Sequence, residues 1–234
     1  SSLTESNCRP SPYHGDALPT ELREPGHLTM AGHKDATRSG YSHHDGVDVT
    51  GPSGEPRQGV PSAVMEIRLA RPDDAEGIRA IYNNEVRTST STFDLVERTT
   101  EAHRAWMAER SGAFSVLVAV DPASDGSSVV GFASLSPYKE RAAYRGTVEN
   151  SIYVADEHRG RGIADQLLGD LLEVARTSGF HSVVARIGGG NEASTALHAK
   201  HGFSVVGIER QVGRKFNRWV DVTVMQVVFD DQRT

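Results

Sequence analysis

One stretch of the sequence, ENSIYVADEHRGRGIA at positions 149–164, restricts the possible folds more than any other. It has the pattern of a short apolar strand, a loop with two arginines and two glycines, and the start of an amphipathic helix. Such a loop delivers unpaired backbone N–H groups to a helix N-terminus, where phosphate groups bind. Gly160 and Gly162 would let a ligand approach the backbone, and Arg159 and Arg161 would add positive charge. The competing interpretation is an ordinary strand–helix turn with solvated arginines, because a Gly-x-Gly pair alone is weak evidence.

Two common nucleotide-binding loops do not fit this stretch. Counted from Gly160, the letters GRGIAD lack the last glycine or alanine of the dinucleotide-binding fingerprint. No Lys-Ser or Lys-Thr pair follows a glycine-rich run, so a P-loop is excluded as well. The loop therefore predicts a phosphate site of another kind.

Charge and composition narrow the class of protein. The chain has 234 residues and a formal net charge of −6, which allows one ordinary domain with additional material and argues against a nucleic-acid binder. No apolar run reaches the roughly 18 residues of a membrane span, and the N-terminus lacks the order of a signal peptide. Cys8 is the only cysteine, which excludes a disulfide framework and a multi-cysteine metal site. We therefore expect a cytoplasmic protein without a membrane or nucleic-acid partner.

Residues 1–64 differ in composition from the rest of the chain. They hold seven of the ten prolines, eight glycines and five of the ten histidines, and their apolar residues follow no period. Such a segment cannot bury enough apolar surface to offset its ordering entropy, so we predict a disordered tail. The alternative is a metal-binding tail, although the spacing of its candidate ligands is not that of a zinc site: Cys8, His33, His43 and His44.

From Met65 onward, strand and helix patterns alternate, which leaves open that the natural protein starts at this methionine. Strands are predicted at 65–70, 114–120, 129–135, 147–154, 181–187, 203–212 and 219–229. Helices are predicted from residues 71–74, from Thr99 or Thr100 to Trp106, and over 162–177 and 191–201, with a turn at 121–126. The order β-α-α-β-β-β-α-β-α-β-β predicts one mixed α/β domain over residues 65–234.

Periodicity also predicts which side chains form the core. In the first strand, Met65, Ile67 and Leu69 fall on one face. Asp73 or Asp74 is suited to cap the helix that follows. The helix at 162–177 carries one apolar stripe: Ile163, Leu167, Leu168, Leu171, Leu172 and Ala175.

Two motifs together resemble the cofactor elements of the GNAT acetyltransferase superfamily. The first, Arg159-x-x-Gly162-x-Ala164, is similar to the loop that binds the pyrophosphate of acyl-CoA in that superfamily. The second begins at Asn191, continues through Ser194 and His198 to Gly-Phe at 202–203, and is similar to the helix beside the pantetheine. The resemblance implies the GNAT fold, a mixed central sheet with flanking helices, and acetyl-CoA as co-substrate. It implies these cofactor-binding residues: Ile152, Tyr153, Val154, Arg159, Gly160, Arg161, Gly162, Ile163, Ala164, Asn191 and Ser194.

Longer phrases resemble the phosphinothricin acetyltransferase group of amino-acid N-acetyltransferases. They are TSTSTF (88–93), SPYKERAAYRGTVENSIYV (136–154), GFHSVVARIGGGNEAST (179–195) and GRKFNRWVDV (213–222). The last phrase departs from the group at Arg214, Phe216, Asn217, Arg218 and Val220, so the exact substrate is not assigned.

The resemblance also implies catalytic roles. Acetyl transfer needs a neutral amine, and Glu149 stands where the family places the base that removes its proton. His198 stands where most members place a tyrosine that protonates the leaving thiolate, and the phosphinothricin group also has histidine there. The competing interpretations are a solvated glutamate at a strand end and a core histidine with satisfied nitrogens. Asn191 would likewise serve as a simple helix N-cap.

A substrate pocket is implied by Lys139, Arg141 and Tyr144, which could hold the anionic groups of an amino acid or its analogue. Phe93 would form a wall of this pocket. The competing interpretations are a solvated basic loop for the first three and a core position for the phenylalanine.

The implied activity is acetylation of the α-amine of a small amino acid or toxic analogue, such as phosphinothricin or methionine sulfoximine. Its purpose would be either antibiotic resistance or metabolism. The amine would attack the thioester directly in a ternary complex, because Cys8 lies in the tail and no Ser-His-Asp set has motif support. A homodimer is expected by resemblance, with the last two strands as the contact. Two alternatives stay open: another amine substrate (an antibiotic, a polyamine or a protein N-terminus) and a non-catalytic acyl-CoA sensor.

Overall fold

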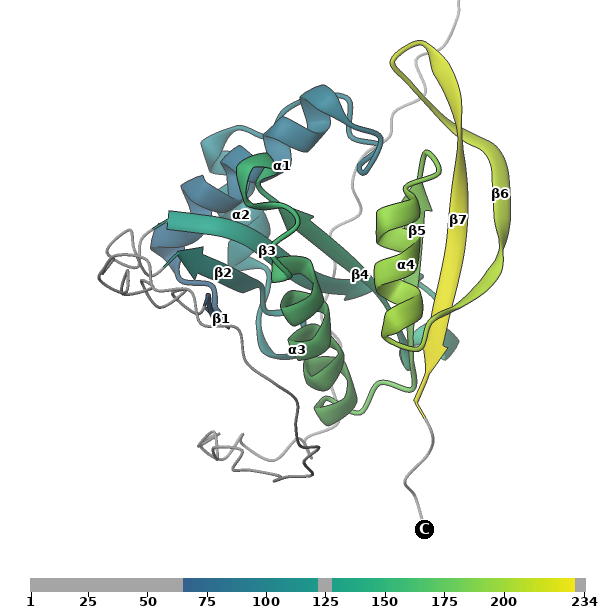
Figure 1. The fold of residues 1–234 in the computed structure, drawn as a ribbon. Helices are drawn as coiled ribbons and strands as arrows, with labels where there is room; N and C mark the ends of the chain where they lie inside the picture. Colours follow the sequence, from purple (N-terminus) through teal and green to yellow (C-terminus); the bar gives the residue numbers. More distant parts are fainter. Residues whose placement is uncertain (1–64, 122–127, 230–234) are drawn as a thin grey trace, which may run out of the picture. The chain divides into compact units, whose positions relative to one another are not determined.

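The computed structural model describes residues 65–121 and 128–229 (Figure 1). The predicted tail at 1–64, its four candidate metal ligands and nearly all of the predicted turn at 121–126 lie outside the described residues.

A seven-stranded sheet forms the centre of the described domain, in the spatial order β1-β2-β3-β4-β5-β7-β6 (Figure 1). The strands are β1 (Glu66–Leu69), β2 (Leu117–Asp121), β3 (Ser128–Pro137), β4 (Thr147–Val154), β5 (Ser182–Gly188), β6 (Ser204–Lys215) and β7 (Arg218–Val228). Neighbours are antiparallel except β4 and β5, which run parallel. A parallel pair needs a crossover, and the helix between β4 and β5 supplies it.

Four helices cover the two faces of the sheet: α1 (Ala75–Thr88), α2 (Thr100–Ala108), α3 (Ile163–Thr177) and α4 (Glu192–Lys200). Each face of the sheet packs into its own apolar core, and alternate residues of β2 point to opposite faces. Ala119 packs into the core that contains α3, and Val118 and Val120 pack into the core that contains α1. All six residues of the predicted α3 stripe are buried, which confirms that prediction.

Short polar contacts set the starts of the first two helices. The Asp74 carboxylate accepts the backbone N–H of Arg71 at 2.6 Å and forms an ion pair with Arg68, which joins β1 to the beginning of α1. The Thr99 hydroxyl accepts the backbone N–H of Ala102 at 3.1 Å and caps α2. Asp74 occupies the N-cap position of α1, as one of the predicted alternatives, but its side chain makes no capping hydrogen bond to that helix, whereas the predicted cap at Thr99 is confirmed.

The order of elements and the mixed central sheet agree with the sequence prediction, and two local expectations are wrong. The strand predicted at 114–120 begins at Leu117, because residues 112–114 form a 3-10 turn that starts at Gly112 with a φ of 57°. Leu69 does not share the burial of Met65 and Ile67 but is 58% exposed, since β1 is a short edge strand. None of the described helices is long and apolar enough to cross a membrane.

We predict that a buried histidine limits the stability of the domain in acid. His103 of α2 is 1% exposed, is stacked on Trp106, and has no hydrogen-bond partner at either ring nitrogen. Burial, followed by the charge of Arg98, lowers the pKa of His103 from 6.5 to about 4. Below about pH 6.5, His103 is therefore protonated in the unfolded chain but stays neutral in the folded chain. The free energy of unfolding falls as the pH drops through this range.

His103→Leu should reduce this acid-induced loss by an amount on the order of 1 kcal/mol between pH 7.5 and pH 5. Urea unfolding of both proteins at the two pH values measures it. An equal loss in the variant would mean that other groups cause the acid sensitivity.

Candidate active site

A cleft opens where strands β4 and β5 separate. Within the described residues, their parallel register runs only from Thr147 to Glu149, opposite residues 182–184, although β4 continues to Val154 beside β3. The backbone N–H of Ala155 donates to Val130 on the β3 side, and backbone groups alternate between the two edges of a strand. The N–H groups of Ile152 and Val154 therefore point away from β3 and into the cleft, where a ligand can use them.

The cleft has a volume of about 890 Å³, which is enough for a cofactor and a small acceptor. Its walls come from the loop at 89–93, the second half of β4, the loop and first turn of α3, the end of β5 and the inner side of α4. It thus collects segments that are far apart in the sequence but meet beside the gap between the two strands.

The glycine loop forms one end of the cleft and is suited to phosphate. Gly160 and Gly162 have φ values of 75° and 78°, and no atom lies within 4 Å of the place where a Cβ would stand at either position. The 15-residue helix α3 starts directly after Gly162, so the N–H groups of its first turn face this open space. Ile163 and Ala164 also line the cleft. This loop fits the diphosphate of a coenzyme A thioester.

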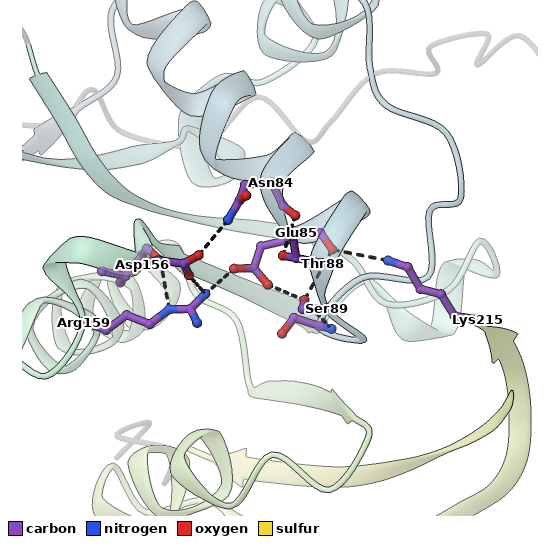
Figure 2. Close-up of polar contacts among 9 residues, drawn as sticks. Asn84, Glu85, Thr88, Ser89, Asp156, Arg159 and Lys215 are labelled. Carbon is purple, nitrogen blue, oxygen red and sulfur yellow. Dashed lines mark hydrogen bonds and ion pairs between the residues drawn. The ribbon is translucent and has the colours of Figure 1, made fainter. Parts of the chain in front are cut away.

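Arg159 lies at the same end of the cleft and is held by carboxylates. It forms ion pairs with Glu85 of α1 and with Asp156, the second at 2.8 Å, and its Nε donates to the backbone oxygen of Val154 at 3.3 Å (Figure 2). Arg161, in contrast, does not line the cleft and donates to the backbone oxygen of Glu157. The structure therefore brings one of the two predicted arginines to the phosphate end.

Glu149 lies at the point where β4 and β5 separate. Its side chain is half-buried and lines the cleft. Burial raises the pKa of the Glu149 carboxyl; the charge of Arg186 lowers it, and the charge of Glu209 raises it. Arg186 and Glu209 form their own two-armed ion pair, with a shortest distance of 2.6 Å. Burial thus makes the Glu149 carboxylate a stronger proton acceptor than an exposed glutamate.

His198 is 4% exposed, and both of its ring nitrogens have partners. Its Nδ1 donates to the backbone oxygen of Ser194 at 2.7 Å, so its Nε2 accepts from the side-chain amide of Asn150 at 2.9 Å. Burial lowers the pKa of His198, and this favours the neutral ring. The contacts are those of a satisfied core histidine, although the ring also lines the cleft.

Two other predicted residues of α4 line the cleft. The Asn191 side chain accepts the backbone N–H of Ser194 at 3.0 Å, so it caps the helix as the simpler interpretation required. Capping by its oxygen leaves the amide nitrogen for a ligand, so the structural and binding roles are compatible.

The predicted substrate residues are not all brought together. Phe93 lines the cleft, and its ring lies over Gly213, where a Cβ would come within 2.2 Å of it. Lys139, Arg141 and Tyr144 do not line the cleft: they lie on the exposed connection between β3 and β4, where the Lys139 ammonium lies 5.2 Å from the centre of the Tyr144 ring. In this structure they form a surface cluster of cations and aromatic rings.

Sequence reasoning missed four charged residues that line the cleft: Glu85, Asp165, Arg186 and Arg218. Two of them carried a signal. Glu85 interrupts the apolar stripe of α1, between Tyr82 and Val86, and Arg186 interrupts the apolar strand SVVARIG. A charge inside a buried pattern often marks a functional site. Arg218 follows a turn at the start of β7 and carried no such signal.

Known proteins resemble this chain over most of the described domain. The family described as "Acetyltransferase (GNAT) domain" matches residues 67–224. An L-methionine sulfoximine/L-methionine sulfone acetyltransferase of Pseudomonas aeruginosa is 41% identical over 169 residues, which cover 72% of this chain and 96% of the relative. A phosphinothricin N-acetyltransferase of Streptomyces coelicolor is 37% identical over 163 residues, covering 69% of this chain and 94% of the relative.

A solved structure shows the same fold. It is the crystal structure of a GNAT superfamily phosphinothricin acetyltransferase from Sinorhizobium meliloti in complex with AcCoA. The TM-score is 0.67 and the sequence identity 32%, over 70% of this chain and 88% of the other.

Removing the cation and removing the anion near Glu149 should shift its pKa in opposite directions. Arg186→Gln removes the neighbouring cation and should raise the pKa of Glu149. Glu209→Gln removes the neighbouring anion and should lower this pKa. Carboxyl NMR titration of Glu149 in the two variants and the parent measures both shifts. Shifts in the same direction would mean that the arginine and the glutamate act on Glu149 through altered packing rather than through their charges.

Proposed function

This chain belongs to the GNAT family of acetyltransferases, and from that premise we propose that it acetylates the α-amine of a small amino acid or amino-acid analogue. The family, the fold and acetyl-CoA as co-substrate, which the sequence motifs implied, are confirmed. The substrate class rests on the relatives, which are named for methionine sulfoximine, methionine sulfone and phosphinothricin. We extend that class to this chain and propose with it a resistance role against such toxins.

The observation that carries this proposal is the gap between β4 and β5 with a carboxyl at its closed end. Acetyl-CoA supplies an activated acyl group as a thioester. The free N–H groups of Ile152 and Val154 are placed to hold its carbonyl oxygen and pantetheine arm, and the loop around Gly160 and Gly162 to hold its diphosphate. We infer that Glu149 then lies beside the carbonyl carbon that the amine attacks.

The proposed reaction proceeds by direct attack. Glu149, or a water bound to it, removes a proton from the ammonium, and the resulting amine nitrogen bonds to the thioester carbon. The carbon–sulfur bond breaks and the nitrogen, now bonded to the acyl carbon, loses its second proton to the site. The site passes one proton to the thiolate, so the products are the amide, the CoA thiol and the protonated base. We propose that His198 protonates the leaving thiolate through its Nε2. In the neutral ring described above this nitrogen carries no proton, so it must first take one up.

Cations around the cleft support an acidic acceptor. Arg186 and Arg218 line it and could bind a substrate carboxylate. Lys139, Arg141 and Tyr144 remain proposed substrate residues by resemblance; for these three to contact the acceptor, their exposed connection has to move toward the cleft.

We further propose a homodimer formed through the last hairpin. The hairpin of β6, β7 and the turn between them exposes seven large apolar side chains: Val205, Val206, Ile208, Val212, Phe216, Trp219 and Val228. Such a surface is typical of a protein–protein contact. The proposed unit of function is residues 65–234, with residues 1–64 as a tail, in a reducing cytoplasm.

Release of free CoA from acetyl-CoA in the presence of a panel of amines tests the function. The panel contains L-phosphinothricin, methionine sulfoximine, methionine sulfone, the common amino acids, a polyamine and an aminoglycoside. We expect turnover on the first three compounds. Turnover only on the polyamine or the aminoglycoside would contradict the substrate class, and tight acetyl-CoA binding without any turnover would favour a sensor.

Substitution of the proposed base gives a second test. Glu149→Gln should reduce kcat by about 100-fold or more, because the amide cannot accept the proton, while acetyl-CoA affinity stays nearly unchanged. Glu173→Gln, on the exposed side of α3, is the matched control and should retain full activity. Steady-state kinetics and calorimetric acetyl-CoA binding measure the two effects. Undiminished turnover in Glu149→Gln would assign the base to another group.

A further inference from the structure

Glu85 is a buried carboxylate whose two oxygens contact opposite parts of the cleft. Its side chain is 4% exposed, on the apolar stripe of α1. One oxygen forms the ion pair with Arg159 at the phosphate end, and the other accepts the hydroxyl of Ser89 at the start of the loop 89–93 (Figure 2). A buried carboxylate is stable only while such partners are in place.

The loop 89–93 is packed against the acceptor end of the cleft at several points. Thr90 lies so close to Gly188 that a Cβ there would come within 2.5 Å of the Thr90 backbone oxygen. The buried Lys215 ammonium donates to the backbone oxygen of Thr92 at 2.8 Å. It also donates to the backbone oxygen of Glu85 at 3.4 Å (Figure 2). The position of this loop therefore sets the shape of the wall that faces the substrate.

We propose that Glu85 is a positioning residue that couples the capture of the diphosphate by Arg159 to the placement of the loop 89–93. This inference rests on the proposed function, because it takes the phosphate end and the acceptor end as parts of one active site. Arg159 has five N–H donors, and the contacts with Glu85, Asp156 and Val154 leave donors free for a phosphate oxygen.

The direction of the coupling follows from this geometry. Since Glu85 orients a guanidinium that still has free donors, it prepares Arg159 for the diphosphate rather than competing with it. A diphosphate bound to Arg159 in turn fixes the Glu85 carboxylate, and the carboxylate fixes Ser89. Binding of the cofactor therefore orders the acceptor wall, and by reciprocity the acceptor strengthens cofactor binding.

Kinetics and binding of the full chain test this link with matched variants. Glu85→Gln should raise the Kd for acetyl-CoA and the KM for the amine by about fivefold or more each, with kcat changed little. Ser89→Ala should raise the KM of the amine alone. Asp156→Asn is the control, because Asp156 also pairs with Arg159 but does not contact the loop 89–93, and it should affect acetyl-CoA binding alone. Glu85→Gln combined with Ser89→Ala should have the amine KM of Glu85→Gln by itself.

Hydrogen exchange gives a readout that needs no turnover. Free CoA, which carries the diphosphate but no acetyl group, should slow amide exchange in residues 89–93 of the parent and of Asp156→Asn, and should not do so in Ser89→Ala or Glu85→Gln. If Glu85→Gln does not fold, Ser89→Ala alone decides between the outcomes.

Several results would overturn the link. Tighter acetyl-CoA binding in Glu85→Gln would make Glu85 a competitor of the diphosphate. An unchanged amine KM in Glu85→Gln and Ser89→Ala would separate Glu85 from the acceptor wall. Equal protection of residues 89–93 by CoA in Ser89→Ala and in the parent would do the same. If the parent binds CoA and turns over amines while these results appear, the link alone fails. If the parent binds no CoA, the proposed function fails and the link fails with it.

Discussion

The early end of the pairing between β4 and β5 is the constraint on which the rest of the site depends. A parallel pair that continued to Val154 would satisfy the backbone of β4 on both edges and leave no room between the strands. Because pairing ends at Glu149, the next residues keep free backbone groups, and the loop after β4 turns directly into α3. One local interruption of the sheet thus produces the cleft, its hydrogen-bond donors and the location of the proposed base.

Glu85 and Glu149 are two of the carboxylates that line this cleft, and their partners suit them to different roles. Glu85 has an arginine and a hydroxyl on its two oxygens, and these contacts suit a charged group that holds other groups in place. Glu149 is half-buried beside Arg186, but that guanidinium is already engaged by Glu209. The cation is thereby partly neutralised, burial raises the pKa of Glu149, and the carboxyl is suited to proton exchange.

Much of the fold could be predicted from the sequence because local and global signals agree in it. The stripe of α3, the capped start of α2 at Thr99 and the boundaries of β4 follow from periodicity and capping alone. The cofactor end of the site was predicted because its residues are contiguous in the sequence. The roles of Glu85 and Arg186 were not, because their partners Arg159, Ser89 and Glu209 are brought to them only by tertiary packing, and the exposed position of Lys139 depends on the path of a loop.

The contact between Asn150 and His198 links the sheet constraint to the proposed chemistry. Asn150 is the first residue of β4 after pairing with β5 ends, and its amide donates across to the ring of His198 on α4. A side-chain hydrogen bond therefore joins the two sides of the gap where the backbone bonds stop. The Asn150 side-chain oxygen is buried without a hydrogen-bond partner. If His198 is to carry a proton on Nε2, the Asn150 amide must turn so that this oxygen accepts it, which gives the unpaired oxygen a partner. The same pair of side chains can thus hold α4 beside β4 whether the ring is neutral or protonated.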